Sequence, residues 1–235
     1  MSIITRLLFI LDTTSKRLSI DIAMKLSRML GTSVDYWLNL QKNYDTLIAE
    51  FESEKELEYD KKKFEAAVEY ALTLTTEHKD FYLLIKKAFA DAGVIFVVLP
   101  NLPGSGINGA TKKVGQNVML MVNDRRFYSD TFWFTLFHEI GHIIDGDYGI
   151  TFEGEQNGQE DAADKYAEDK LIPPDAYKAF LEKKQYGEQA IRLFAQSIGR
   201  DPGIVLGRLQ NDKKVAFTNA ALSKALRHKY KVVTA

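Results

Sequence analysis

The alternation of apolar and polar positions predicts a small helical unit at the start of the chain. Residues 19–30 carry apolar side chains at helical spacing behind a possible N-cap at Ser19, and Gly31 ends the pattern. A second short helix is expected to begin after Ser33 and to run through the segment VDYWLNLQ.

Further along, helical and strand-like patterns alternate once, and helices then dominate. Helical spacing returns in FEAAVEYALTL and FYLLIKKAFADAG, followed by the apolar run VIFVVLP, a loop rich in Gly and Pro, and the strand-like VGQNVMLMVND. Helices are then predicted over residues 130–145, 158–171, 187–199, 202–210 and 218–229. We therefore expect an α+β fold, with a mostly helical domain and a small antiparallel sheet, preceded by a short helical N-terminal segment.

A change in composition near residue 47 predicts that the chain divides into three segments. From Leu47 to about Lys63 both charge signs are dense, which is typical of a solvated helix or a linker. We expect a helical segment at residues 1–46, a charged helical linker at residues 47–79 and the main domain at residues 80–235.

Composition restricts the possible ligands and metal-binding residues of the chain more than it restricts the fold. The 235 residues carry a formal net charge of −1, so no global field favours nucleic acid or anionic lipid. The chain has no cysteine, which fits a reducing cytoplasm and restricts any metal ligands to His, Asp and Glu. The apolar stretch Leu7 to Leu11 is too short for an export signal, and no run approaches the length of a membrane-spanning helix.

The segment DTFWFTLFHEIGHIIDG contains the motif H-E-x-x-H at His138, Glu139 and His142. Residues four apart lie on one face of a helix, so both imidazoles can reach a single ion while Glu139 projects beside its bound water. Apolar residues surround the motif and predict a buried helix, and Gly141 suggests that another backbone comes close. The alternative is a pair of core histidines that donate hydrogen bonds to backbone or carboxylate groups.

A catalytic zinc usually takes three protein ligands, and a nearby helix offers the third. In NGQEDAADKYAEDKLIPP, Glu160 and Asp164 share a face with the apolar positions of the helix. We expect Glu160 to ligate the metal and Asp164 to accept a hydrogen bond from a ligating histidine. The alternative for Glu160 is a solvated acid at a helix start, and the alternative for Asp164 is an ordinary surface acid. Asp161, Glu168 and Asp169 are expected to be surface charges.

These segments resemble the ImmA/IrrE family of metallopeptidases over roughly Phe81 to Gln210. The matching segments are NLPGSGINGAT, the strand into VND, the helix FWFTLFHEIGHII, the block E-x-x-A-D-x-Y-A ending in LIPP, and FAQSIGRDPGIVLGRLQ. The resemblance implies a zincin-like peptidase fold, with His138, His142 and Glu160 as metal ligands and Glu139 as general base. The wider gluzincin pattern E-x-x-x-D falls on Glu160 and Asp164.

The N-terminal segment is similar to the last helices of HigA-type helix-turn-helix antitoxins, which are often fused ahead of such peptidases. The first helices of that motif are missing, so direct DNA binding is not expected, and residues 1–46 are interpreted as a partial helix-turn-helix segment that packs or dimerises. The family implies a protein substrate, typically a DNA-binding repressor. The alternative function is a regulatory binding module with a structural or vestigial metal site.

The expected reaction is zinc-assisted peptide hydrolysis in the cytoplasm, with manganese as an alternative ion. A substrate peptide is expected to add as a strand along the edge of the sheet, with VMLMV as the candidate edge. Tyr128, Tyr148 and Arg126 are equal candidates for the oxyanion stabiliser. The G-x-G-x-x-G spacing at Gly104, Gly106 and Gly109 lacks a following helix and is interpreted as a turn, and His78 and His228 are expected to be surface histidines.

Overall fold

The computed structural model describes residues 18–31, 33–39, 41–42, 45, 57–99, 107–123, 128–152 and 157–230. The chain divides into two compact units, one formed by Met1–Ser53 with Leu102–Gly106 and the other by Glu54–Asn101 with Ile107–Ala235. The candidate site lies in the second, larger unit.

The N-terminal unit contains the two short helices that the sequence predicts. Helix α2 (Ile20–Leu30) begins at Ser19, whose side chain accepts a hydrogen bond from the backbone N–H of Ile22, and it ends at Gly31 in the left-handed conformation (φ 67°). Residues 34–39 form the second helix, and the Ser33 hydroxyl accepts a hydrogen bond from the Tyr36 N–H at 3.1 Å.

A four-stranded mixed sheet lies in the larger unit, in the order β1-β3-β2-β4. Its strands are β1 (Val94–Leu99), β2 (Ile107–Val114), β3 (Asn117–Asn123) and β4 (Ile150–Phe152). β2 pairs antiparallel with β3 and β4, whereas β1 and β3 are parallel. The mostly helical α+β class is confirmed, but an all-antiparallel sheet was the wrong expectation. A tight turn at Gly115 (φ 61°) reverses the chain between β2 and β3, and β3 then lies between β2 and β1, parallel to β1.

The predicted sheet edge is also corrected. Val118–Val122, the VMLMV segment, belongs to β3 and pairs on both sides, with β1 and with β2. The described sheet ends at β1 and at β4, so an added strand would have to pair with one of these two. The sequence did not predict β2, because Gly and Lys have low strand propensity and the segment contains both. Pairing with the neighbouring strands β3 and β4 imposes the extended conformation on it.

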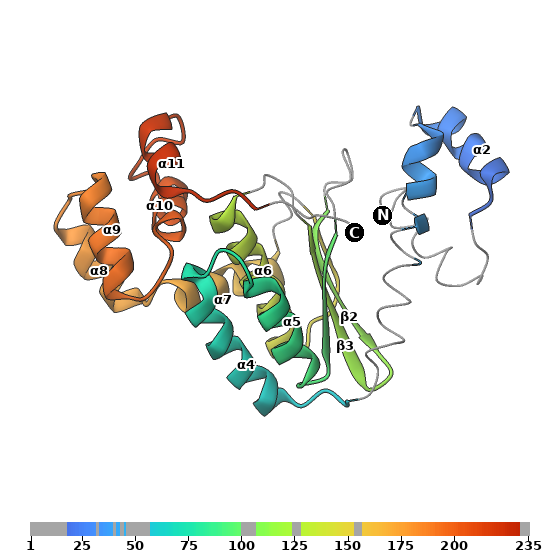
Figure 1. Ribbon diagram of the computed structural model, residues 1–235, viewed down its shortest axis with the longest axis horizontal. Coiled ribbons are helices and arrows are strands. Elements are labelled where there is room, and N and C mark those ends of the chain that lie inside the picture. The colour runs from blue at the N-terminus through green and yellow to red at the C-terminus, as the bar shows by residue number, and fades with distance from the viewer. Residues whose placement is uncertain are drawn as a thin grey trace. The chain divides into compact units, whose positions relative to one another are not determined.

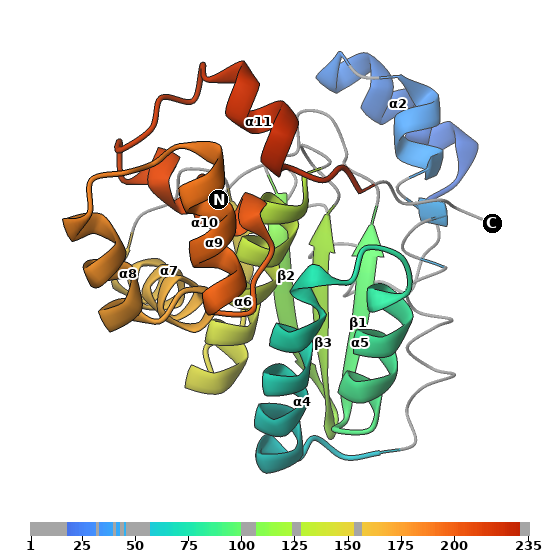
Figure 2. The same ribbon diagram turned by 60° about the vertical axis from the view of Figure 1, so that its left-hand side comes forward.

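Helices α4 (Lys61–Thr73), α5 (Phe81–Ala90) and α6 (Ser129–Asp145) lie on one face of the sheet (Figures 1 and 2). α6 matches the helix predicted over residues 130–145, and it is buried on nearly all sides as its apolar sequence implied. Its largest side chain, Trp133, is fully buried in the same core as Phe64, Phe89 and Phe96.

Helix α4 and the following 3-10 turn η1 (Leu74–Thr76) belong to this core, although the sequence predicts a charged helical linker over residues 47–79. The lysines at the start of α4 are exposed, whereas Phe64, Val68 and Ala71 are buried on the opposite face. The charge density describes only the solvent side of an amphipathic helix.

Helix α7 (Gly158–Leu171) packs against α6, and α8 (Pro174–Glu182), α9 (Glu188–Ser197), α10 (Pro202–Asn211) and α11 (Ala220–Leu226) complete the unit. α11 is shorter than the predicted 218–229 helix, because residues 227–230 run back to the start of α6 and form an antiparallel bridge between Tyr128 and Lys229. Among the described residues, no helix combines the length and apolarity that a membrane crossing requires.

Candidate metal centre

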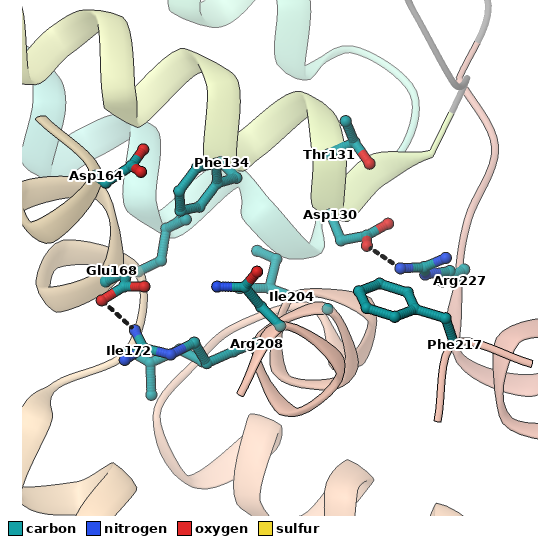
Figure 3. Close-up of a pocket in the computed structure, with 13 residues that line it drawn as sticks. Asp130, Thr131, Phe134, Asp164, Glu168, Ile172, Ile204, Arg208, Phe217 and Arg227 are labelled. Carbon is teal, nitrogen blue, oxygen red and sulfur yellow. Dashed lines mark ion pairs between the residues drawn. The ribbon is translucent and has the colours of Figure 1, made fainter. Parts of the chain in front are cut away.

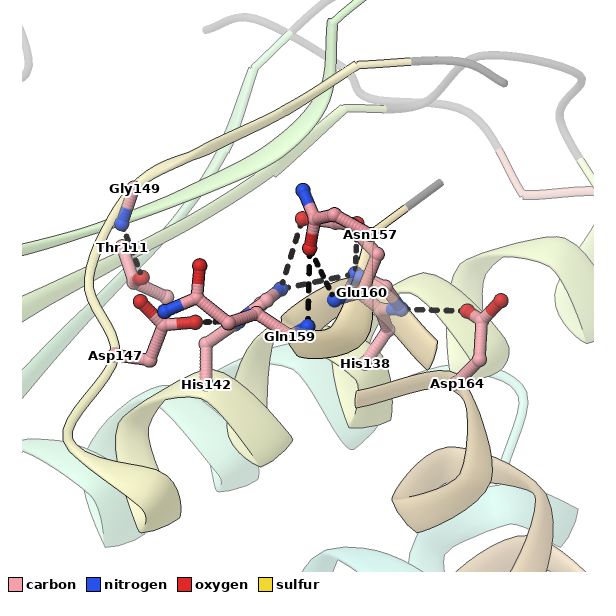
Figure 4. Close-up of polar contacts among 9 residues, drawn as sticks. All are labelled: Thr111, His138, His142, Asp147, Gly149, Asn157, Gln159, Glu160 and Asp164. Carbon is pink, nitrogen blue, oxygen red and sulfur yellow. Dashed lines mark hydrogen bonds and ion pairs between the residues drawn. The ribbon is translucent and has the colours of Figure 1, made fainter. Parts of the chain in front are cut away.

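Helix α6 presents His138 and His142 one turn apart on the same face (Figure 4). Both side chains are 7% exposed, and their Nε2 atoms are 3.1 Å apart. Two Nε2 atoms at this distance can share a hydrogen bond only if one ring is a donor and the other an acceptor, whereas a cation would satisfy both lone pairs at once.

Helix α7 supplies the third ligand through its first turn. The Asn157 side chain caps the helix by accepting hydrogen bonds from the N–H groups of Gln159 and Glu160, both at 3.0 Å. This cap fixes the backbone at Glu160, whose carboxylate oxygens lie 3.1 Å from His138 Nε2 and 3.5 Å from His142 Nε2. Metal–ligand bonds of about 2.0–2.1 Å at tetrahedral angles separate ligand atoms by roughly 3.3 Å. His138, His142 and Glu160 therefore form a group that could hold a metal ion.

Gly141 allows the two ligand-bearing helices to approach closely. A Cβ atom at this position would lie 3.2 Å from the Cα of Ala163 and 3.3 Å from the Cβ of Tyr166, both on α7. The expectation that another backbone passes Gly141 is confirmed, and this contact sets the distance between Glu160 and the histidines.

The other nitrogen of each histidine faces a carboxylate. His138 Nδ1 lies 2.7 Å from Asp164 Oδ1, and His142 Nδ1 lies 3.3 Å from Asp147 Oδ2. When each Nδ1–H donates to its carboxylate, each Nε2 keeps its lone pair for a ligand. The geometry matches the role predicted for Asp164, although its side chain is 54% exposed.

Asp147 was missed by the sequence reasoning. It lies just beyond α6, where Gly146 takes the left-handed conformation (φ 74°) and the Asp147 N–H donates to the His142 carbonyl at 2.9 Å. The available signal was a glycine C-cap followed at once by an acid, because that turn brings the acid back beside the last helical histidine.

Carboxylates outnumber the histidines at this centre and shape its electrostatics. Burial by itself would lower the pKa of His138, but its hydrogen bond to Asp164 and the nearby Glu139 and Glu160 outweigh burial, and the pKa is raised above its usual value. A positive charge is therefore favoured at this position, and a divalent cation would meet the same surplus of negative charge.

Glu139 is fully buried beside the histidines, with the Thr151 side chain next to its carboxylate. Burial raises the pKa of Glu139 to about 8, and the nearby His138 and a hydrogen bond from Thr151 oppose this shift to a smaller extent. The carboxylate lies against Gly109 of β2, where a Cβ atom would come within 2.2 Å of Glu139 Oε1. Gly109 thus lies in strand β2, where it allows close packing, so the predicted turn is wrong at this position. Gly104 and Gly106 lie outside the described residues.

The remaining candidates fall elsewhere or outside the described residues. Tyr128 stacks beneath the Arg227 guanidinium at 5.1 Å from the ring centroid, and Tyr148 is half-buried. Arg126 lies outside the described residues. Glu168, expected at the surface, is instead largely buried and pairs with Arg208 at 3.1 Å.

A second group of histidines forms where the sequence showed only isolated ones. His78, Asp201 and His228 also meet the distance condition for a metal-binding group. Asp201 is fully buried, and its Oδ2 lies 2.9 Å from His228 Nδ1 and 3.4 Å from His78 Nε2. His228 is exposed, as expected of a surface histidine, and His78 is half-buried, but both rings face the buried Asp201.

The chain was also compared with known proteins. No protein-family model matches it, and a search of curated proteins found no match. The site is consequently interpreted from its own geometry and from the sequence motifs.

Proposed function

We propose that the chain is a zinc-dependent endopeptidase of the ImmA/IrrE type that hydrolyses a peptide bond in a protein substrate. The observation that carries the proposal is the convergence of two histidine Nε2 atoms and the Glu160 carboxylate within 3.1–3.5 Å of one another, with the carboxylate of Glu139 buried beside them. A purely structural pair of core histidines would not require this fourth, non-ligating acid.

The donor set favours zinc. Two imidazole nitrogens and one carboxylate oxygen, with a fourth position left for water, are typical of catalytic zinc sites, and manganese is the alternative ion. A bound zinc ion would polarise the scissile carbonyl and lower the pKa of its water.

Residues of the chain carry out the other parts of the proposed hydrolysis. Glu139 accepts the proton from the attacking water and passes it to the leaving amine, because it lies beside the ligands without being one. Asp164 and Asp147 hold His138 and His142 in the tautomer that leaves Nε2 free. Gly109 gives the Glu139 carboxylate its space under β2.

A DNA-binding repressor is the substrate class that the family resemblance suggests, in the cytoplasm. The competing function is a regulatory binding module whose metal centre is structural. The two differ in what they require of Glu139: hydrolysis needs its carboxylate, whereas a structural metal centre needs only His138, His142 and Glu160.

The test compares wild-type protein with Glu139→Gln, using Glu182→Gln at an exposed position as the control. We expect all three proteins to retain about one metal ion per chain by elemental analysis, and only Glu139→Gln to lose cleavage of a proteome-derived peptide library, by roughly 10²–10⁴-fold. A Glu139→Gln protein that cleaves as fast as wild type would refute the peptidase mechanism.

A further inference from the structure

Residues 227–230, the segment that follows α11, contact the start of α6, and we call this segment the strap. The backbone N–H of Ser129 donates to the carbonyl of His228 at 2.9 Å, and Tyr128 forms an antiparallel bridge with Lys229. Ser129 is the first residue of α6, the helix of the candidate metal centre. The strap therefore holds the beginning of this helix by backbone contacts.

Side chains of the strap reinforce the backbone contacts. Arg227 lies 2.6 Å from Asp130 in the first turn of α6 (Figure 3). The ring of Tyr230 packs against Phe81 and Phe132, with centroid distances of 4.7 Å and 5.8 Å. Both phenylalanines belong to the buried core, so separation of the strap from α6 would expose apolar surface to water.

A carboxylate and a histidine outside the strap fasten it to the rest of the unit. Asp201 is fully buried, and its Oδ2 faces both Nδ1 of His228, on the strap, and Nε2 of His78, which lies between η1 and α5. The second nitrogen of His78, Nδ1, lies 3.0 Å from the hydroxyl of Tyr230. Two residues of the strap are therefore held by this cluster.

Protonation changes the charge balance of this cluster because the two rings are stacked. The ring centroids of His78 and His228 are 3.7 Å apart, and both rings face the carboxylate of Asp201. Asp201 balances one protonated ring, whereas two protonated rings place like charges in contact beside a single carboxylate. Burial and the adjacent His228 lower the pKa of His78, and Asp201 and Glu77 oppose this shift only in part. The folded cluster therefore resists a second proton.

The other charged and titratable groups near the rings do not compensate for a second proton. Glu77 is exposed to solvent, which weakens its interaction with the rings. Burial raises the pKa of Tyr230, so its hydroxyl stays neutral. Arg200 donates to backbone carbonyls, and Arg227 is paired with α6. Among the described residues, Asp201 is thus the one buried acid that faces both rings.

We propose that the stacked histidines His78 and His228 form a pH-sensitive latch, which holds the strap on α6 while at most one ring is protonated and releases it when both are. Each ring takes its proton from solvent, and no other group changes its charge. Release separates the strap from Asp201 and His78, and it removes the backbone hydrogen bond at Ser129. The latch does not depend on the proposed peptidase reaction, because it needs only the folded chain and protons.

Amide hydrogen exchange of the full chain tests the latch, because the N–H of Ser129 is hydrogen-bonded to the strap. The opening equilibrium at Ser129, corrected for the intrinsic rate of amide exchange, is expected to rise as the pH falls below 6.5, the ordinary pKa of histidine. The rise is up to about tenfold per pH unit for each proton that release takes up. The N–H of Phe64 in α4 donates to the carbonyl of Asp60, so it reports the core away from the strap and is expected to change much less.

Two variants with a matched control connect the response to the latch. His228→Asn and His78→Gln each keep a side-chain amide that can donate to Asp201, but neither new side chain titrates. In both variants we expect no rise of the opening equilibrium at Ser129 between pH 7.5 and 5.5. Lys224→Asn, at an exposed position on α11, is expected to keep the wild-type response.

A wild-type protein in which Ser129 and Phe64 respond equally to pH would overturn the proposal, since acid would then loosen the whole unit. A full wild-type response in either histidine variant would overturn it as well, because the remaining histidine alone would account for the opening. A selective response at Ser129 that both variants lose and Lys224→Asn keeps would support the latch.

Discussion

Among the described residues of the larger unit, two groups of histidines and acids have their ligand atoms close enough for a metal ion. In the first, His138 and His142 have ring planes 73° apart, and their Nε2 atoms and the Glu160 carboxylate meet around one point. In the second, the rings of His78 and His228 are stacked, with centroids 3.7 Å apart and planes at 25°.

The difference in ring orientation matters because an imidazole lone pair lies in the plane of its ring. In stacked rings the lone pairs lie in two nearly parallel planes, one above the other, so they cannot both point at one ion unless a ring rotates. Asp201 is also engaged already, since its Oδ1 accepts the Gly203 N–H at 2.8 Å and caps α10. The first group is therefore arranged for a cation, and the second for hydrogen bonds that hold residues 228–230 beside Asp201 and His78.

Metal content should separate the two groups most sharply. We expect His138→Ala and Glu160→Ala to lose the single metal ion of the wild-type chain, because each removes a ligand, and His78→Ala and His228→Ala to keep it. Elemental analysis after dialysis against a weak chelator measures this. Two metal ions per wild-type chain, one lost in His228→Ala, would contradict the argument from ring stacking.

The carboxylate behind a ligating histidine should have the next largest effect. Asp164→Asn is expected to weaken metal binding about 10–100-fold, because the amide no longer fixes the His138 tautomer. Competition with a chromogenic chelator gives the affinity. Asp161→Asn, an exposed acid on the same helix, is the control and should bind metal as wild type does; an equal loss in both variants would implicate the general charge of α7 instead.

A glycine packs against the buried Glu139 beside the first group, and another packs against the buried Asp201 of the second group, which allows a matched comparison. A Cβ at Gly109 would meet Glu139 Oε1 at 2.2 Å, and a Cβ at Gly203 would meet Asp201 Oδ1 at 2.7 Å. We expect each Gly→Ala change to reduce the free energy of unfolding by about 1–3 kcal/mol in urea titrations. Only Gly109→Ala should also impair cleavage per folded chain, because it displaces Glu139.

Gly149→Ala is the control for both glycine variants, since a Cβ there meets nothing within 4 Å. It should remain within about 0.5 kcal/mol of wild type. Impaired cleavage per folded chain in Gly203→Ala would show that the two groups are coupled, and would argue against separate roles.

The sequence predicted those features whose residues lie close together along the chain. His138, Glu139 and His142 share one helix, so their spacing alone defines their common face, and Glu160 was accessible because the next acid-bearing helix had the same kind of stripe. The close approach at Gly141 was predictable because a glycine inside an apolar helix has a cost that packing must explain.

The features that escaped prediction depend on chain reversals and long-range contacts. Asp147 reaches His142 only through the turn at Gly146, and the mixed sheet results from β3 lying between β1 and β2. The contact of Gly109 with Glu139 and the pairing of His78 with His228 join segments far apart in the chain. No local periodicity encodes such neighbours.

The smallest expected effect is on pH dependence, and it belongs to the second group. Burial and the adjacent His228 lower the pKa of His78 below its ordinary value of 6.5, although Asp201 and Glu77 oppose the shift. As the pH falls through 6.5 the unfolded chain takes up a proton that the folded protein does not, so His78 costs stability there until it is itself protonated in the folded state. The metal-free His78→Asn protein should therefore lose less in Tm than wild type between pH 7.5 and 5.5. Scanning calorimetry on both proteins, with Lys79→Asn as an exposed neighbouring control, measures the difference. Parallel Tm curves for wild type and His78→Asn would mean that His78 is protonated to the same extent in the folded and unfolded states. The stacked pair of His78 and His228 would then not be a proton-sensitive contact, and this difference between the second group and the metal centre would be lost.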